Sequence, residues 1–331
     1  MSTSFIEQSP VLQSVLPVIE ASRNVRTNAD EIRRVASWMA YEEFTLPGDM
    51  FPVDLGRDPD HLLDVIMLSS SLDFAFTDFA TSVKFEVDHG GTRWSDSEAM
   101  FACLHRALQA GLPITSGAWQ ARVVRTDLEE LFRGSIEMPM LDERVMILNE
   151  IGRTLEARYG GRWANWARGC ERALYADGNG LLERLVADFP RFRDESVYDG
   201  ETVRIAKLAQ LSLWSLHATW AHLGESGLRD LPRMTAFADY IVPVGLRLMG
   251  ITEYAPDLED RINRGVLIPR DSHDEIEIRA HTLYATALLA EACNERRAAD
   301  RQLVIPQIDY RFWKAFHTTH WPHHLTRTVM Y

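Results

Sequence analysis

The 331-residue sequence has only three cysteines, Cys103, Cys170 and Cys293, and they lie far apart. This number and spacing exclude a disulfide framework and a paired CxxC metal site. The sequence also lacks the apolar run of roughly 20 residues that a membrane span needs and the basic start of a secretory signal. We therefore expect a cytoplasmic protein in a reducing compartment, without a membrane partner.

Positive charge is also scarce. Lys and Arg number 35 against 48 Asp and Glu, which gives a formal net charge of −13. Because binding to long nucleic acids depends mainly on phosphate neutralisation, this balance argues against a stable nucleic-acid complex. A nucleotide-sized ligand needs only a few local cations. The GxGxxG, GxxxxGK[ST], GxSxG and HExxH motifs are absent, so dinucleotide, P-loop, serine-hydrolase and zincin interpretations lose their main support.

Most of the chain has a helical hydrophobic period. The predicted helices cover residues 30–40, 60–68, 99–110, 142–159, 181–188, 203–223, 235–250 and 272–296. Ser95 and Glu98 have the spacing of a capping box before one of them. Only Val83 to Trp94 alternates like strands, around His89-Gly90-Gly91, which predicts a β-hairpin.

These patterns predict a mostly α protein with a small β-hairpin element. We expect a single large helical domain over residues 1–331, because no repeat or Pro-rich linker divides the chain. A weak sub-boundary lies near residues 115–125, and residues 1–20 are expected to form an arm or a short helix.

Histidines gather near the end of the chain at His317, His320, His323 and His324. The first two share one helical face, but Trp321-Pro322 interrupts a helix before the second two, and no cysteine lies nearby. A zinc site needs three or four ligands in a defined geometry. A polar segment, or one histidine that contacts an anionic ligand, therefore fits this pattern better than a metal site.

Three aspartates each lie within a cluster of aromatic residues. The clusters are Asp73 with Phe74, Phe76 and Phe79; Asp239 with Phe237 and Tyr240; and Asp309 with Tyr310, Phe312, Trp313 and Phe316. Aromatic residues at this spacing usually form core, and a buried carboxylate usually caps a helix or pairs with a cation. Together, the three clusters also fit a pocket that stacks a flat heterocycle and accepts its N–H groups.

Several segments resemble one protein family, the queuosine salvage proteins, which are queuosine 5′-phosphate N-glycosylases. The matching segments are Leu72–Phe76, Gly111–Ser116, Glu143-Arg144, Ile147–Glu150, Phe189–Asp194, Asp199-Gly200, Val203, Lys207–Gln210, Met234–Tyr240, Glu277–Arg279, Ile308–Tyr310, Trp313 and Arg327–Tyr331. The resemblance runs from about residue 60 to the end. The sequence departs from the family pattern at Leu208, commonly basic, at Asp73, commonly Asn, and at Lys314, commonly acidic.

The resemblance implies a fold similar to DNA glycosylases of the helix-hairpin-helix type. It implies hydrolysis of queuosine 5′-monophosphate to queuine and ribose 5-phosphate, for tRNA queuosine salvage, without a metal or organic cofactor. The reaction passes through a ribosyl cation, which a carboxylate stabilises. Asp239, in the matching Phe-Ala-Asp-Tyr motif, is our first candidate for this carboxylate and Asp230 the second. Alternatively, Asp239 only caps the helix that is predicted to contain it.

The other candidate residues bind substrate. Asp73 and Asp309 would accept N–H groups of the base, while Phe74, Tyr310 and Trp313 pack against its ring and Phe237 and Tyr240 limit water. Lys207 is the first candidate for the 5′-phosphate, followed by His324 and Arg327; Lys314 is a further candidate contact. Each cation is alternatively a surface ion pair. Two other functions stay open: an N-glycosylase for another nucleoside, and a non-catalytic protein that binds modified nucleotides.

Overall fold

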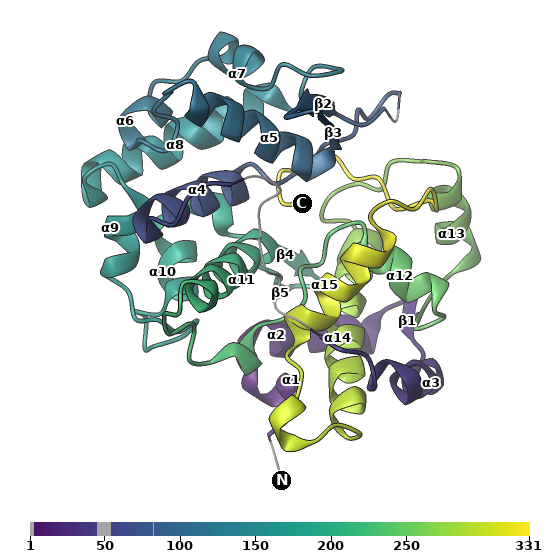
Figure 1. Cartoon of the computed structure of the whole chain (residues 1–331). Helices are drawn as coiled ribbons and strands as arrows, with labels where there is room; N and C mark the ends of the chain where they lie inside the picture. Colours follow the sequence, from purple (N-terminus) through teal and green to yellow (C-terminus); the bar gives the residue numbers. More distant parts are fainter. Residues whose placement is uncertain (1–2, 45–53, 82) are drawn as a thin grey trace.

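Helices dominate the computed structural model, which describes residues 3–44, 54–81 and 83–331 (Figure 1). The α-helices are α1 (Phe5–Gln8), α2 (Pro10–Ala21), α3 (Ala29–Met39), α4 (Pro59–Ser71), α5 (Asp96–Gln109), α6 (Gly117–Gln120), α7 (Arg125–Leu131), α8 (Leu141–Tyr159), α9 (Trp163–Arg168), α10 (Leu181–Asp188), α11 (Lys207–His222), α12 (Val242–Leu248), α13 (Pro256–Asn263), α14 (His273–Asn294) and α15 (Ile305–Phe316). The strands are β1 (Val25–Thr27), β2 (Glu86–His89), β3 (Thr92–Ser95), β4 (Glu195–Tyr198), β5 (Glu201–Arg204) and β6 (Thr252–Tyr254). Short 3₁₀ helices are η1 (Pro190–Phe192), η2 (Leu231–Arg233) and η3 (Ala299–Arg301). The prediction of a mostly helical fold is confirmed.

Three large hydrophobic clusters hold the helices together. One joins α2, α3, α12, α14 and α15; a second joins α4, α8, α9, α10 and α11; and a third joins α4, α5, α7 and α8. In Figure 1, α5, α7 and α8 lie at the top, α4 and α11 lie in the middle, and α14 and α15 lie below. Within the described part of the chain, no helix has both the length and the apolar character to span a membrane.

The predicted hairpin is present as β2 and β3, which pair antiparallel. Its turn residues, Gly90 and Gly91, have φ angles of 61° and 79°, the left-handed conformation that glycine adopts without strain. Two more antiparallel pairs, β1 with β6 and β4 with β5, were not predicted. Their strands have only three or four residues, too few to show an alternating pattern.

Helix α11 begins at Lys207, later than the predicted start at residue 203. The preceding residues 201–204 form β5, which turns back onto β4 through Asp199-Gly200. Both turn residues have left-handed φ angles, 47° and 92°. The prediction was wrong here because this turn chemistry was overlooked in favour of the helical period of the following residues.

Helix α12 is shorter than the helix predicted over residues 235–250. The backbone N–H groups of Thr235 and Phe237 donate to the side chains of Gln210 (2.9 Å) and Asp309 (2.8 Å) rather than to helical carbonyls. Side chains from α11 and α15 therefore hold this segment in an irregular conformation. Contacts from distant parts of the chain have overridden its local helical pattern.

The capping box predicted at the start of α5 does not form. Ser95 occupies the N-cap position, but its side chain makes no capping hydrogen bond. The next residue, Asp96, has a left-handed φ of 55°; its N–H donates to the Phe85 oxygen, and its carboxylate pairs with Lys84 at 2.7 Å. This strained turn points Ser95 and Glu98 toward the cavity described below.

One buried histidine links α14 to the N-terminal region. His281 is only 2% exposed, and its ring nitrogens lie 2.8 Å from Thr27 Oγ1 and 3.0 Å from Ser22 Oγ. Burial lowers the pKa of His281 to about 4. The unfolded chain, whose histidines have a pKa near 6.5, therefore binds this proton more tightly than the folded protein does.

We predict that His281 makes the protein sensitive to mild acid. As the pH falls from about 6.5 to about 4, its contribution to the free energy of unfolding is lost at up to about 1.4 kcal/mol per pH unit. The His281→Gln variant should lose that part of the slope when urea unfolding is compared at pH 6.5, 5.5 and 4.5. The exposed His222 provides the control, since His222→Gln should keep the parent slope. Equal slopes for all three proteins would contradict this prediction.

Candidate active site

A cavity of about 520 Å³ lies where the helical groups meet. Its lining comes from the end of α4 and the turn after it, the start of α5, α11, residues 237–241, α15, residues 317–320 and Tyr331. Segments that are distant in sequence thus form one enclosure. Its volume is within the range of sites that bind small molecules.

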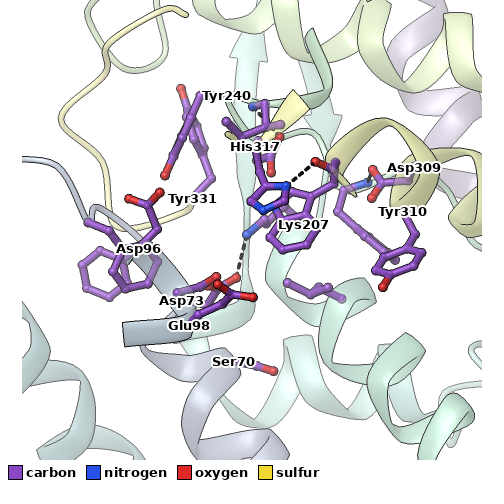
Figure 2. Close-up of a pocket in the computed structure, with 18 of the residues that line it drawn as sticks. Ser70, Asp73, Asp96, Glu98, Lys207, Tyr240, Asp309, Tyr310, His317 and Tyr331 are labelled. Carbon is purple, nitrogen blue, oxygen red and sulfur yellow. Dashed lines mark hydrogen bonds and ion pairs between the residues drawn. The ribbon is translucent and has the colours of Figure 1, made fainter. Parts of the chain in front are cut away.

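Lys207 and Asp73 form an ion pair at the centre of this cavity, with 3.0 Å between Nζ and Oδ2 (Figure 2). Their side chains are only 6% and 17% exposed. Figure 2 shows Asp309 and Tyr310 on one side of Lys207, and Asp96 and Tyr331 on the other. A buried ammonium is costly without a counter-charge, so the carboxylate of Asp73 stabilises Lys207 inside the fold.

Two buried arginines fix the turn that carries Asp73. Arg144 donates hydrogen bonds to the main-chain oxygens of Leu72, Phe74 and Ala75. Arg191 donates from Nε to the Ser71 oxygen at 2.8 Å. The two guanidinium groups also lie 4.1 and 4.8 Å from the centre of the Phe74 ring. The turn is therefore held through its backbone, which leaves the Asp73 side chain free to face Lys207.

The two carboxylate oxygens of Asp239 have different surroundings. Oδ1 accepts the backbone N–H groups of Ile241 (2.8 Å) and Val242 (3.0 Å) and so caps α12. Among the described residues, Oδ2 accepts no hydrogen bond, and Asp239 lines the cavity. The pKa of Asp239 is raised overall: burial has the largest effect, and Lys207 and the two N–H groups lower the pKa in part. The expected capping contact therefore occupies Oδ1 alone and leaves Oδ2 without a hydrogen bond among the described residues.

Asp309 is more deeply buried than Asp239. It is 4% exposed on α15, and its Oδ2 accepts the Phe237 N–H at 2.8 Å. Burial, and then the neighbouring charge of Asp239, raise the pKa of Asp309 well above its usual value. Because Asp239 has two N–H donors and Asp309 has one, the pKa of Asp309 is raised further than that of Asp239.

One side of α15 gives the cavity a wall of nearly parallel aromatic rings. The ring centres of Trp313 and His317 are 4.4 Å apart and nearly parallel, at 8°, and Tyr310 continues the stack 6.3 Å from Trp313. Residues 310, 313 and 317 are spaced by three and four, so they share one side of the helix. Such a wall can stack against a planar heterocycle.

The opposite end of the cavity is acidic and hydroxyl-rich. Asp96 and Glu98 line it, and the buried Oδ1 of Asp96 has no hydrogen-bond partner in the part of the chain that the structure describes. Burial raises the pKa of Tyr240 and of Tyr331 well above 10, so both phenols keep their proton at neutral pH. This end offers acceptors to a cationic or hydroxylated ligand.

The structure brings most of the predicted site residues to the cavity. Those that line it are Asp73, Phe74, Lys207, Phe237, Asp239, Tyr240, Asp309, Tyr310 and Trp313. The three aromatic–aspartate clusters therefore converge, as the pocket hypothesis requires.

Four predicted residues lie outside the described lining. The carboxylate of Asp230 accepts hydrogen bonds from the N–H groups of residues 174 and 175, at 2.7 and 3.1 Å, and so stabilises that backbone turn. His324 is buried behind Tyr331, whose phenol lies 3.2 Å from its Nε2. Arg327 pairs with Glu143 at 2.9 Å, and Lys314 is exposed. The local motif matches did not reveal that three of these side chains have other partners and that the fourth is exposed.

Other lining residues were not predicted. Trp214 lies on α11, and its buried Nε1 has no partner in the described chain. This helix is buried on nearly all sides, so no amphipathic pattern marks the face that meets the cavity. Lys84 and Asp96 were assigned only to a hairpin and a helix cap. His317 was noted within the histidine cluster, which was the one sequence signal for it.

Comparison with known proteins gives a consistent result. A family model described as queuosine salvage protein matches residues 54–331. A protein of Sphaerobacter thermophilus named queuosine 5′-phosphate N-glycosylase/hydrolase is 32% identical over 324 residues, which cover 97% of each chain. Proteins of the same name from Mus musculus (28% identical, 89% of each chain) and Schizosaccharomyces pombe (29% identical, 87% of each chain) are also similar.

The raised pKa of Asp309 leads to a prediction about stability. Because the folded protein binds this proton more tightly than the unfolded chain, the free energy of unfolding should fall as the pH rises from about 4 toward the raised pKa, by up to about 1.4 kcal/mol per unit. Asp309→Asn keeps an acceptor for Phe237 but cannot ionise. In urea unfolding measured from pH 5 to 8, the free energy of unfolding of the variant should therefore rise relative to that of the parent as the pH rises. If the difference between the two proteins is the same at every pH, the prediction is wrong and Asp309 is ionised throughout.

Proposed function

This chain belongs to the queuosine salvage protein family, and we propose that it hydrolyses the N-glycosidic bond of queuosine 5′-phosphate, releasing queuine and ribose 5-phosphate. The observation that carries the proposal is the pair of aspartates Asp239 and Asp309, which line one cavity together with Lys207 and a wall of aromatic rings. In this role the protein supplies queuine for tRNA queuosine salvage. A likeness to helix-hairpin-helix DNA glycosylases and a cytoplasmic location stay predictions from the sequence.

Asp239 stabilises the ribosyl cation in this proposal. Cleavage of the N-glycosidic bond leaves positive charge at the anomeric carbon, and a carboxylate beside that carbon lowers the barrier. The unpartnered Oδ2 of Asp239 is available for this contact, while Oδ1 stays bound to two N–H groups and fixes the side chain. The same oxygen can take a proton from the water that replaces the base.

Asp309 assists the departing base. Queuine is a 7-deazaguanine, so the nitrogen that purine glycosylases can protonate is replaced by carbon, and help must reach another base atom. A carboxylic acid kept protonated by burial can donate that hydrogen bond or proton. The proton balance closes within the pair, since Asp309 gives a proton to the base and Asp239 takes one from water.

Other lining residues are the proposed contacts of the base, its substituents and the 5′-phosphate. Tyr310 and Trp313 are the proposed stacking partners of the base, which is supported by their parallel rings on the cavity side of α15. Asp73, Asp96 and the nearby Glu98 supply acceptors for the N–H groups, the cationic amine and the cyclopentene diol of queuine. Lys207 is the proposed phosphate ligand, because an ammonium has three N–H groups and Asp73 uses one.

Replacing Asp239 should abolish most turnover. We expect Asp239→Asn to release queuine from queuosine 5′-phosphate about a hundredfold or more slowly than the parent, the scale of one lost electrostatic contact in the transition state. Mass spectrometry of free queuine provides the measurement. Asp230→Asn, which alters a carboxylate outside the cavity, should keep parent activity. A loss in that variant alone would move the chemistry to Asp230, and no release by any protein would favour a binding protein.

The phosphate contact can be tested by comparing nucleotide with nucleoside. Lys207→Met should raise KM for queuosine 5′-phosphate about tenfold to a hundredfold more than KM for queuosine, since only the nucleotide loses a charged hydrogen bond. Lys84→Met is the matched control, because Lys84 also lines the cavity but pairs with Asp96. If Lys84→Met causes the nucleotide-specific loss instead, the phosphate binds at the acidic end.

A further inference from the structure

Behind the cavity, a buried ion pair joins α14 to the loop between η1 and β4. Arg279 and Asp194 are 2% and 3% exposed. Nη2 of Arg279 lies 2.6 Å from Oδ2 of Asp194, and Nη1 lies 3.0 Å from Oδ1. Each carboxylate oxygen thus meets one guanidinium nitrogen in the planar, two-point geometry that only arginine forms. Neither side chain is among the described residues that line the cavity.

Arg279 holds the segment that carries Asp239. Its third nitrogen, Nε, donates a hydrogen bond to the main-chain oxygen of Ala238 at 3.1 Å. Ala238 directly precedes Asp239 in the chain. The guanidinium group also lies 4.5 Å from the centre of the Tyr331 ring, and Tyr331 lines the cavity. The arginine therefore contacts the wall of the site from behind at two places.

Asp194 holds the start of α11, where Lys207 is the first residue. Its Oδ2 accepts the Lys207 backbone N–H at 3.1 Å, and its main-chain oxygen accepts the N–H groups of Ile205 and Ala206. Ala206 occupies the N-cap with a left-handed φ of 51° and has no side-chain oxygen for capping. A carboxylate from a distant segment thus replaces the local cap and also suits the positive end of the helix.

We propose that Arg279 and Asp194 are a positioning pair for the proposed hydrolysis, on which this inference rests: together they set the separation between the Asp239 carboxylate and the Lys207 ammonium. One partner holds the backbone beside Asp239, and the other holds the backbone of Lys207 itself. The two functional groups belong to segments more than 30 residues apart in the sequence, so no local structure fixes their spacing. The two-point ion pair joins the two segments at Ala238 and Lys207, in addition to the hydrogen bonds between Gln210 and Thr235.

The first experiment is the substitution Arg279→Lys, which keeps the positive charge but removes the two-point contact with the carboxylate. A lysine can reach Asp194 or the Ala238 oxygen at one point only, so the two segments can drift apart. Since a misplacement of about 1 Å can cost a factor of about a hundred in rate, we expect kcat to fall about tenfold to a hundredfold and KM to change less than about threefold. Both Lys207 and Asp239 are retained in this variant, so bound substrate keeps its phosphate contact, and the loss falls mainly on the alignment of the anomeric carbon with Asp239.

The pH profile supplies a readout that a purely structural role would not move. The groups that face Asp239 are Lys207 from α11, Asp73 from the turn after α4, Asp309 from α15 and the adjacent Tyr240. Among them, Lys207 lowers the pKa of Asp239. Moving this cation away raises the pKa, so the acidic limb of kcat/KM should shift to higher pH in Arg279→Lys.

Asp194→Asn is the second variant, because its amide has nearly the same shape and keeps an acceptor for the Lys207 N–H. It should show the same direction of change in kcat and in the acidic limb, even if Arg279→Lys fails to fold. Arg162→Lys is the matched control: Arg162 pairs with the buried Asp64 through two nitrogens and joins α9 to α4 away from Asp239. The free energy of unfolding of Arg162→Lys should fall, while its kcat and the acidic limb of its kcat/KM profile should stay at the parent values.

The outcomes separate this inference from the function on which it rests. Parent release of queuine, with unchanged kcat and acidic limb in both Asp194→Asn and folded Arg279→Lys, would overturn the positioning role and leave the hydrolase. Equal shifts in Arg162→Lys would also overturn it, since general loosening would then explain the effect. No release by the parent would overturn the proposed function and this inference together.

Discussion

The ion pair of Lys207 and Asp73 is the interaction on which the candidate site depends. Lys207 begins α11 and Asp73 follows α4, and these two helices pack against each other in the middle of the protein. The buried ammonium requires a carboxylate partner, and its charge also lowers the pKa of Asp239 and of Asp309, two further carboxylates of the cavity. Lys207 thus offsets the mutual repulsion of three aspartates in the cavity.

This balance gives two chemically similar aspartates different properties. Asp239 has two N–H donors and a nearby cation, while Asp309 has one N–H donor and deeper burial. The proposed roles, a charged carboxylate at the ribosyl cation and a protonated acid at the base, follow from that difference rather than from residue type. Buried arginines hold the backbone around the functional side chains. Arg144, Arg191 and Arg279 all donate hydrogen bonds to main-chain oxygens near Asp73 or Asp239.

Much of the fold and part of the site could be predicted from the sequence. The long helices and the glycine hairpin follow from local pattern, and the aspartates at 73, 239 and 309 were identified because each stands among aromatic residues. Predictions at Asp230, His324, Arg327 and Lys314 rested on motif proximity alone. The structure uses these side chains in a turn, a buried histidine–tyrosine contact and a surface pair, or leaves them exposed.

The sequence by itself determined that the protein is mostly helical, that it carries a net charge of −13, and that it resembles one family, because these properties depend on composition, period and local matches. Only the tertiary structure decided which oxygen of Asp239 remains unpartnered, that Lys207 faces Asp73, and that Asp194 caps a helix thirteen residues further along the chain. These contacts join segments that are distant in sequence. Their geometry and desolvation arise only when the helices pack, so no local pattern encodes them.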